Sequence, residues 1–267
     1  MITVVSIRRG KYNDYHIELS TQETLRVSED VLVKYRLLKG SELTEATLKE
    51  IQKNATVDFG LQLALNYISY QLRSEKEVRN YLKEKEIPWQ DQAKIIERLK
   101  ELGVVDDQLY GESFVRTQIR LSDKGPIRVR QQLKEKGISD LIIEAVLELF
   151  TFEDQFDLAY RVAEKAAYRF RTKSHQETLN KLRQTLMQKG FSSEIITSVL
   201  DELNLEKDEE EEVAALFNEG EKIWRRHQSK PFKERKNKTK QSLYQKGFDL
   251  DIIAKFIAEK ELENDAE

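Results

Sequence analysis

This 267-residue sequence contains three clusters of basic side chains whose type and spacing suit the binding of anionic groups. Such clusters attract the phosphates of a nucleic acid or the acidic wall of a protein groove. Arg116 and Arg120 are four residues apart, so they share one face of a predicted helix. The clusters are Arg116, Arg120, Lys124, Arg128 and Arg130; Lys165, Arg169, Arg171 and Lys173; and Lys222, Arg225, Arg226, Lys230, Lys233, Arg235, Lys236, Lys238 and Lys240.

The recurrence of these clusters along the chain predicts a discontinuous basic stripe that binds a polyanion or an acidic partner. The alternative is that each cluster is an ordinary solvated helix face, which is the commoner outcome for a single run of charge. An acidic run at 206–212 precedes the third cluster, and we place it at a helix N-terminus, where anions are stabilised. The stripe comprises all of the first two clusters and, from the third, Arg225, Arg226, Lys230, Lys233, Arg235 and Lys236.

Residues suited to catalysis or metal binding form no pattern in the sequence. There is no cysteine, and the three histidines, His16, His175 and His227, stand apart from any metal-ligand spacing. No glycine-rich phosphate loop or nucleophile elbow occurs. We therefore expect no catalytic, cofactor-binding or metal-binding residues, no cofactor and no enzyme activity. The lack of cysteine, of a signal-peptide layout and of an apolar stretch of about 20 residues predicts a cytoplasmic protein without membrane contact.

The elements that carry the basic residues belong to a repeat. One motif recurs four times: a leucine, two variable residues, a lysine, a glycine and an apolar residue. Its leucines lie at intervals of 51, 53 and 57 residues, and a pair of isoleucines follows each copy. The glycine predicts a left-handed residue that ends a helix, and the lysine before it lies in the last helical turn. Glu86 takes the place of the glycine in the first copy, so the cap there must differ or be strained. The four copies are Leu82–Ile87, Leu133–Ile138, Leu186–Phe191 and Leu243–Phe248.

Each repeat has room for three helices. The first helices are expected at about 57–72, 106–121, 153–170 and 209–227. The three prolines fall at predicted helix starts, where a missing N–H costs little. Ser74 to Glu77 and Ser174 to Glu177 have the form of capping boxes, and Asp106 is expected to cap a helix. The prolines are Pro88, Pro126 and Pro231.

The fold class expected is mainly α, with tandem three-helix repeats forming an elongated curved body and a small N-terminal antiparallel β section. Charged residues are 35% and hydrophobic residues 39%, which disfavours one thick core and suits stacked units. A compact helical bundle is the alternative. The sheet should cover about 2–28, with a helix from Ser28 to Gly40 and another from about Thr44. The domains expected are an N-terminal cap at 1–54 and repeats at 55–104, 105–150, 151–204 and 205–267.

Several segments in the first half of the chain resemble the RecX family of regulators of the RecA recombinase, in its long form from low-GC Gram-positive bacteria. The match covers about residues 60–150 and is specific in order and spacing, whereas the last two repeats match in shape alone. The segments are Arg73-Ser-Glu-Lys-Glu-Val78, Tyr81-Leu82-Lys83, Val105-Asp-Asp-Gln-Leu-Tyr110, Phe114-Val115-Arg116, Lys124-Gly-Pro-Ile-Arg-Val-Arg-Gln-Gln-Leu133 and Lys136-Gly137-Ile138.

The resemblance implies a non-enzymatic modulator that lies in the groove of the RecA–DNA filament and limits strand exchange and ATP hydrolysis. Among the binding residues, the resemblance supports the basic positions that lie inside the matched segments, which are Arg116, Lys124, Arg128 and Arg130. Arg120 is added from its charge alone. The partners expected are the RecA filament and single- or double-stranded DNA, and a monomer is expected. Two alternatives are a stand-alone DNA-binding repeat protein, which would show a steep salt dependence without RecA, and a helical scaffold for peptides.

Overall fold

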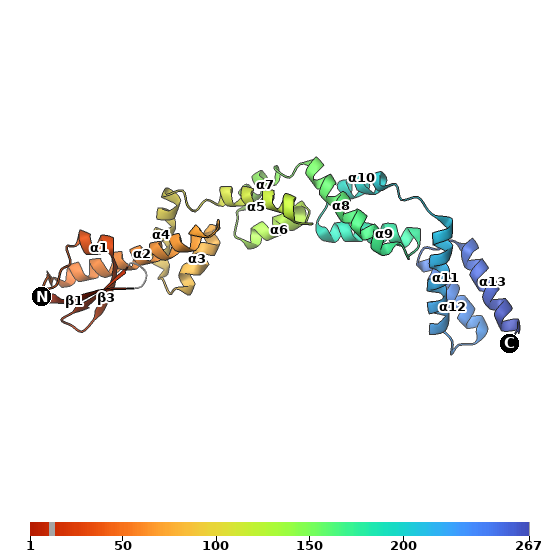
Figure 1. Cartoon of the computed structure of the whole chain (residues 1–267), viewed down its shortest axis with the longest axis horizontal. Coiled ribbons are helices and arrows are strands. Elements are labelled where there is room, and N and C mark those ends of the chain that lie inside the picture. The colour runs from red at the N-terminus through yellow and green to blue at the C-terminus, as the bar shows by residue number, and fades with distance from the viewer. Residues whose placement is uncertain (11–13, 267) are drawn as a thin grey trace. The chain divides into compact units, whose positions relative to one another are not determined.

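The computed structural model describes residues 1–10 and 14–266, with residues 265 and 266 described by their backbone only. Four strands and thirteen helices are present in this part of the chain (Figure 1). The chain divides into two compact units. The first comprises residues 1–114 and 132–146, and the second comprises residues 115–131 and 147–267.

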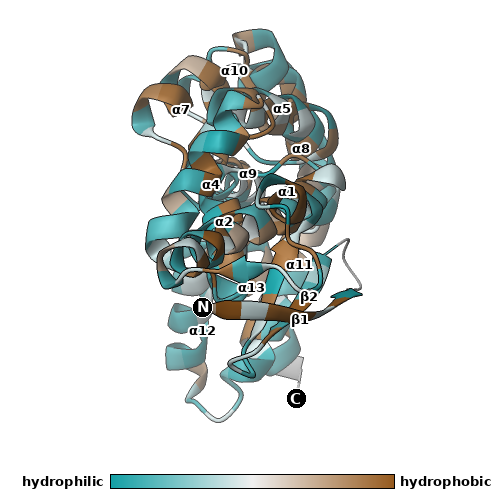
Figure 2. Ribbon diagram, turned by 90° about the vertical axis from the view of Figure 1, so that its left-hand side faces the viewer, coloured by the Kyte–Doolittle hydropathy of each residue, from teal (hydrophilic) through white to brown (hydrophobic). Residues whose placement is uncertain are grey.

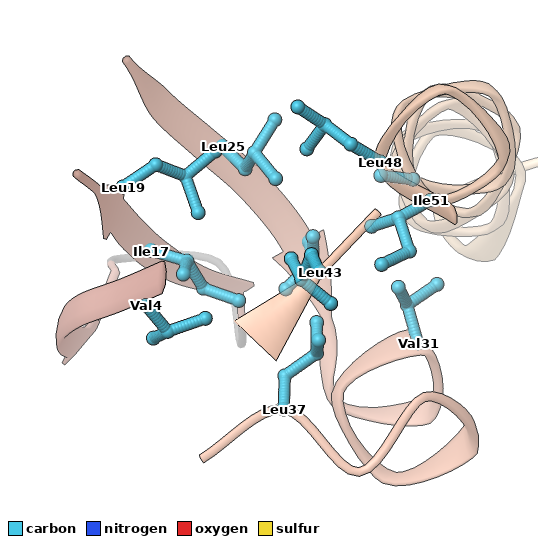
Figure 3. Close-up of a cluster of buried hydrophobic side chains, with 11 residues drawn as sticks. Val4, Ile17, Leu19, Leu25, Val31, Leu37, Leu43, Leu48 and Ile51 are labelled. Carbon is cyan, nitrogen blue, oxygen red and sulfur yellow. The ribbon is translucent and has the colours of Figure 1, made fainter. Parts of the chain in front are cut away.

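The N-terminal sheet is antiparallel and has the strand order β3-β2-β1-β4. Its inner face packs on the start of α2, where Leu48 and Ile51 join the buried strand residues (Figure 3). The predicted sheet is thus confirmed, although residues 11–13 lie outside the described part. The two-residue strand β4 was not predicted, because it is too short to show alternation. The strands are β1 (Ile2–Arg9), β2 (Asp14–Leu19), β3 (Thr24–Ser28) and β4 (Glu42–Leu43).

The first helix, α1 (Glu29–Lys34), begins after Ser28, whose hydroxyl accepts a hydrogen bond from the Val31 N–H. This start was predicted, but the helix ends six residues before Gly40. Arg36 has a φ of 49°, in the left-handed region, and the helix cannot continue through it.

The long helix α2 (Glu45–Ser69) begins after Thr44, as predicted. Two separate helices were expected here, and that expectation was wrong, because one helix runs through the proposed domain boundary at 54/55. The segment at 52–57 contains neither proline nor glycine, so nothing in it stops a helix. Gly60 lies inside α2 without breaking it. Its missing side chain makes room for Ile95, because a Cβ at this position would lie 2.4 Å from Ile95 Cδ1.

The C-terminal part of α2 packs with α3 (Glu75–Glu84) and α4 (Trp89–Glu101) as the first three-helix module. The other three modules follow in chain order, and the fold class of three-helix units after a small β section is confirmed. Their helices are α5 (Asp107–Leu121), α6 (Pro126–Glu135) and α7 (Asp140–Leu147); α8 (Phe152–Phe170), α9 (His175–Lys189) and α10 (Ser193–Leu203); and α11 (Glu209–Arg226), α12 (Phe232–Gln245) and α13 (Leu250–Ala266).

The helix-ending glycines have the conformation predicted for them. Gly137, Gly190 and Gly247 have φ values of 84°, 89° and 84°. Glu86 adopts the same left-handed region at 60°, so the first copy is strained rather than different.

The predicted helix starts are also confirmed. Pro88 and Pro231 are N-caps, Pro126 is the first residue of α6, and the Asp106 carboxylate accepts the Gln108 and Leu109 N–H groups.

Figure 2 shows hydrophilic and hydrophobic residues mixed along the helices. Across the described residues, no helix combines the length and the apolar character that crossing a membrane requires. The same residues contain no cluster of histidine and carboxylate side chains that could hold a metal ion.

Candidate partner-binding surface and module junctions

Successive modules meet where the second helix of one begins and the second helix of the next ends. At the first such junction the buried Ser74 hydroxyl donates to the Lys136 carbonyl at 2.7 Å and accepts the Glu77 N–H. The Asp107 carboxylate accepts the Glu75 N–H at 2.8 Å. One serine therefore both caps α3 and binds the end of α6, so the two modules are tied by buried polar contacts.

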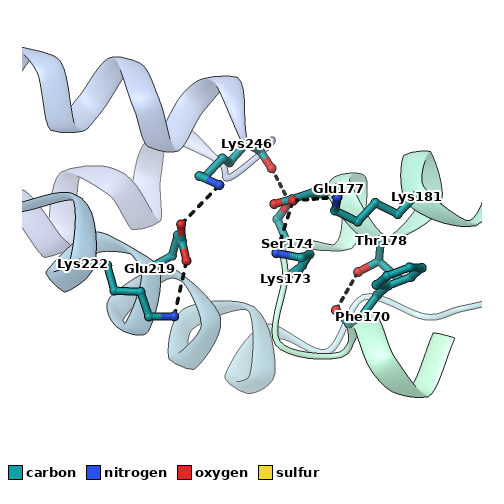
Figure 4. A network of polar contacts seen from close by, with 9 residues as sticks. All are labelled: Phe170, Lys173, Ser174, Glu177, Thr178, Lys181, Glu219, Lys222 and Lys246. Carbon is teal, nitrogen blue, oxygen red and sulfur yellow. Dashed lines mark hydrogen bonds and ion pairs between the residues drawn. The ribbon is translucent and has the colours of Figure 1, made fainter. Parts of the chain in front are cut away.

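The junction between the third and fourth modules has the same construction (Figure 4). The buried Ser174 hydroxyl donates to the Lys246 carbonyl and accepts the Glu177 N–H. The Glu212 carboxylate accepts the His175 N–H at 2.8 Å. Ser74 and Ser174 lie far apart in the sequence but make the same contacts. The first and third modules therefore present equivalent sites to the modules that follow them.

The junction between the second and third modules uses the backbone instead of a serine. The Gly125 N–H donates to the Lys189 carbonyl at 2.8 Å, and the Ile127 N–H donates to the Gly190 carbonyl at 3.1 Å. The Arg128 guanidinium adds a hydrogen bond to the Gln188 carbonyl at 2.9 Å. A Cβ at Gly125 would lie 2.5 Å from the Gly190 carbonyl oxygen, so only glycine allows this approach.

The lysine before each helix-ending glycine forms an ion pair. Lys136 pairs with Glu77 at 2.6 Å, Lys189 pairs with Asp123, and Lys246 pairs with Glu219 at 3.2 Å. Burial alone would raise the pKa of Glu77, but the hydrogen bonds from Lys136 and from the Ser74 N–H outweigh it and lower that pKa. The hydrogen bond from Lys189 lowers the pKa of Asp123. The sequence motif predicted a favourable helix-dipole contact for these lysines, and the ion pairs add to it.

The predicted basic stripe lies entirely in the second unit. Arg116 and Arg120 are exposed on α5, and neither forms an ion pair with the described residues. The loop that follows them contributes Ser122 and Asp123 to a hollow of about 250 Å³. Lys165 and Arg169 of α8 line the same hollow. The hollow therefore gathers cations of the second cluster, whereas none of the five basic residues of the first cluster lines it.

Arg161 also lines this hollow, and the sequence reasoning missed it. It lies four residues before Lys165 and eight before Arg169, which puts all three on one face of α8. This four-residue spacing was the sequence signal that could have identified Arg161. The hollow thus presents three exposed cations from one helix, and its Asp123 is neutralised by Lys189.

The rest of the second cluster faces elsewhere. Arg171 is the C-cap of α8, and it lines a different hollow together with Lys173. That hollow also contains Glu206, Asp208 and further acids of the α11 start, and Lys173 pairs with Glu177 at 3.4 Å. Asp208 caps α11, so the acidic run lies at a helix N-terminus as predicted.

The third cluster is partly used inside the fourth module. Arg235 donates to the Trp224 carbonyl at 2.9 Å and stacks on its indole at 4.0 Å. Lys230 pairs with Glu234, and Lys236 pairs with Glu261. The stripe residues from this third cluster that remain exposed without an ion pair to a described residue are Arg225, Arg226 and Lys233.

The first cluster includes residues with structural contacts as well. Lys124 is half-buried in the loop, and its N–H bonds the Ser122 hydroxyl. Arg130, which was predicted to belong to the binding stripe with Arg128, is half-buried. Arg128 is exposed yet bonded across a module junction. Reversing these two charges would disturb packing, so they are poor positions at which to test binding.

Repeated three-helix modules define this chain as a helical-repeat protein. The sequence matches the first three-helix domain of RecX at residues 61–99 and the second at 106–147. The third three-helix domain of RecX matches twice, at residues 153–200 and 209–257. The chain belongs to the RecX family, whose members are regulatory proteins and not enzymes.

Full-length relatives support this assignment. The regulatory protein RecX of Enterococcus faecalis is 52% identical over 99% of this chain and 100% of its own length. That of Bacillus licheniformis is 38% identical over 97% of this chain and 98% of its own. A crystal structure of regulatory protein RecX matches with a TM-score of 0.64 at 33% identity, covering 75% of this chain and all of that one. The structure of RecX from Lactobacillus salivarius is 40% identical over 57% of this chain and 98% of that one, with a TM-score of 0.54.

Proposed function

We propose that this protein regulates the RecA recombinase by binding the RecA–DNA filament and limiting strand exchange and ATP hydrolysis. The observation that carries the proposal is the near full-length similarity to regulatory proteins RecX, together with four three-helix modules. A chain of linked modules can contact several protomers of a filament at once, which raises affinity through effective concentration.

The binding surface we propose is the exposed part of the basic stripe around the hollow of the second unit. Its members are Lys165 and Arg169, which line the hollow, and Arg116 and Arg120 of α5; all four are exposed and form no ion pair with the described residues. Arg161 joins them from the same helix face. Such a surface is complementary to phosphates or to an acidic protein groove. The protein would act as a cytoplasmic monomer.

The test measures DNA-dependent ATP hydrolysis by RecA on single-stranded DNA with increasing amounts of this protein. Substoichiometric amounts should suppress hydrolysis, because one bound molecule affects more than one protomer. The variant Arg116→Glu with Arg120→Glu should need about tenfold more protein or a larger excess, because a reversed charge repels the partner. Unchanged hydrolysis at saturating wild-type protein would refute the proposal.

A matched control reverses two charges of the same spacing away from the stripe. Lys49 and Lys53 are exposed on α2, and neither has an ion pair with the described residues. Lys49→Glu with Lys53→Glu changes the net charge equally, so it should inhibit RecA as the wild type does. Equal loss in both variants would mean that net charge, rather than this surface, governs binding.

The basic hollow also supports a second candidate, a stand-alone DNA-binding protein. Binding to duplex DNA without RecA should then fall steeply with salt, because each neutralised phosphate releases counterions. Weak DNA binding beside strong inhibition of RecA favours the first proposal.

A further inference from the structure

The first unit contains a hollow of about 750 Å³ that shares no residue with the basic stripe. It lies between α3 and α4 and reaches the Gly137 turn of the next module. Its volume falls in the range of about 300–1,000 Å³ that is typical of ligand sites. The hollow is therefore large enough for a nucleotide-sized group.

An exposed tryptophan forms one wall of this hollow. Trp89 is the first residue of α4, and 69% of its surface is exposed. The neighbouring Ile87 and Gln92 are buried, so the local core is complete without the indole. The Arg79 guanidinium lies over the indole ring at 5.5 Å and Arg79 Nη1 is buried without a hydrogen-bond partner in the described structure. An aromatic surface and a cationic side chain thus stand side by side at the edge of the hollow.

The charge of the hollow is positive. Lys76, Arg79 and Lys83 line it, and the exposed Lys83 has no ion pair with the described residues. Glu75 is already neutralised, because Arg79 bonds it at 2.7 Å and Lys100 at 2.6 Å. Asp107, the other carboxylate, accepts the Glu75 N–H and is half-buried at the start of α5. Three cations therefore line the hollow beside two carboxylates that are both engaged.

We propose that this hollow binds single-stranded nucleic acid, with one base stacked on Trp89 and the adjoining phosphates on Arg79 and Lys83. Stacking on an aromatic side chain beside cations is the usual way in which proteins hold single strands. An acidic peptide would use the cations but would leave the exposed indole without a flat partner. A duplex would hide its bases from the indole. The combination of surfaces therefore favours an unpaired strand.

Intrinsic fluorescence tests the proposal, because the chain has two tryptophans and Trp224 is 7% exposed in the core of the fourth module. An eight-residue oligothymidylate added to the full-length protein, without RecA, should quench the Trp89 emission in a saturable way. Trp89→Leu should abolish the quenching and weaken binding, measured by anisotropy of a labelled strand, about tenfold or more. Lys83→Glu should weaken binding and flatten its salt dependence.

The matched control is Tyr70→Leu, because Tyr70 is an aromatic residue of the same unit that is 85% exposed outside the hollow. Its affinity for the strand should equal that of the wild type. Unchanged affinity in Trp89→Leu, or equal binding of a duplex of the same length, would overturn the proposal. Displacement of the strand by oligoglutamate as effectively as by unlabelled oligothymidylate would also overturn it and identify the hollow as a site for acidic protein segments. The assay contains no recombinase, so its failure would leave the proposed regulation of RecA untouched.

Discussion

The turn that ends α3 and the turn that ends α6 have the same backbone conformation but different neighbours. In the first, the Glu86 N–H donates to the Lys83 carbonyl and the Ile87 N–H to the Leu82 carbonyl. The Gly137 turn repeats both bonds with Lys134 and Leu133. A Cβ at Gly137, however, would lie 2.7 Å from the Cβ of Lys76 in the preceding module, whereas Glu86 is exposed.

This comparison explains why one copy of the motif has a glutamate, Glu86, where the other three have a glycine. Gly137, Gly190 and Gly247 each meet the helix start of the module before them, so a side chain is excluded by contact as well as by backbone strain. The first module follows the N-terminal sheet and has no such neighbour at its turn. A glutamate at this turn therefore meets only the backbone strain of the left-handed conformation and no contact with a neighbouring module. The glycine of the motif is therefore a mark of module-to-module contact, in addition to being a helix stop.

The largest effect is expected when a side chain is forced into a packed turn. Gly190→Ala places a Cβ 2.7 Å from the Arg128 backbone nitrogen and adds a left-handed alanine. We expect the free energy of unfolding to fall by about 3 kcal/mol, measured by urea denaturation. Gly103→Ala is the control, because Gly103 is also left-handed, at 67°, but has open space at its Cβ. It should cost about 1 kcal/mol, and equal losses in the two variants would show that strain alone selects glycine.

A smaller effect should distinguish a serine that ties two modules from a serine that only caps a helix. Ser174→Ala removes a buried hydroxyl that caps α9 and also bonds Lys246, so it should cost about 2–3 kcal/mol. Ser192 caps α10 through the Ile195 N–H and is exposed, so Ser192→Ala should cost about 1 kcal/mol. Urea denaturation of both variants measures the difference. Indistinguishable losses would mean that the contact with Lys246 contributes nothing to stability.

Local patterns predicted the parts of this fold that local chemistry decides. The glycine turns, the prolines at helix starts and the caps at Ser74 and Ser174 follow from a few adjacent residues. The continuity of α2 was missed because two helices were expected on either side of residues 52–57, although this segment contains no helix-breaking residue. The proposed domain boundaries and the elongated curved body stay predictions.

The site was harder to predict, because its contacts join residues far apart in the sequence. Arg128 was taken as a binding residue, but it bonds Gln188, 60 residues away, and no local pattern marks that pairing. The second cluster was taken as one group, but α8 ends between Arg169 and Arg171, which sends the two side chains to different hollows. Trp89 was not singled out, because sequence alone does not separate an exposed tryptophan from a core one.

The smallest effect, and the one opposite in sign, is expected where the repeat lacks its glycine. Glu86→Gly relieves a left-handed non-glycine residue without opening a cavity, because Glu86 is exposed. Glycine also makes the unfolded chain more flexible, which offsets part of the gain, so we expect stabilisation of about 0.5–1 kcal/mol. The exposed helical Glu84→Gly is the control and should instead lose about 0.5–1 kcal/mol. Thermal and urea unfolding of both variants measure the contrast, and a destabilised Glu86→Gly would mean that the glutamate side chain makes a contribution larger than the strain it imposes.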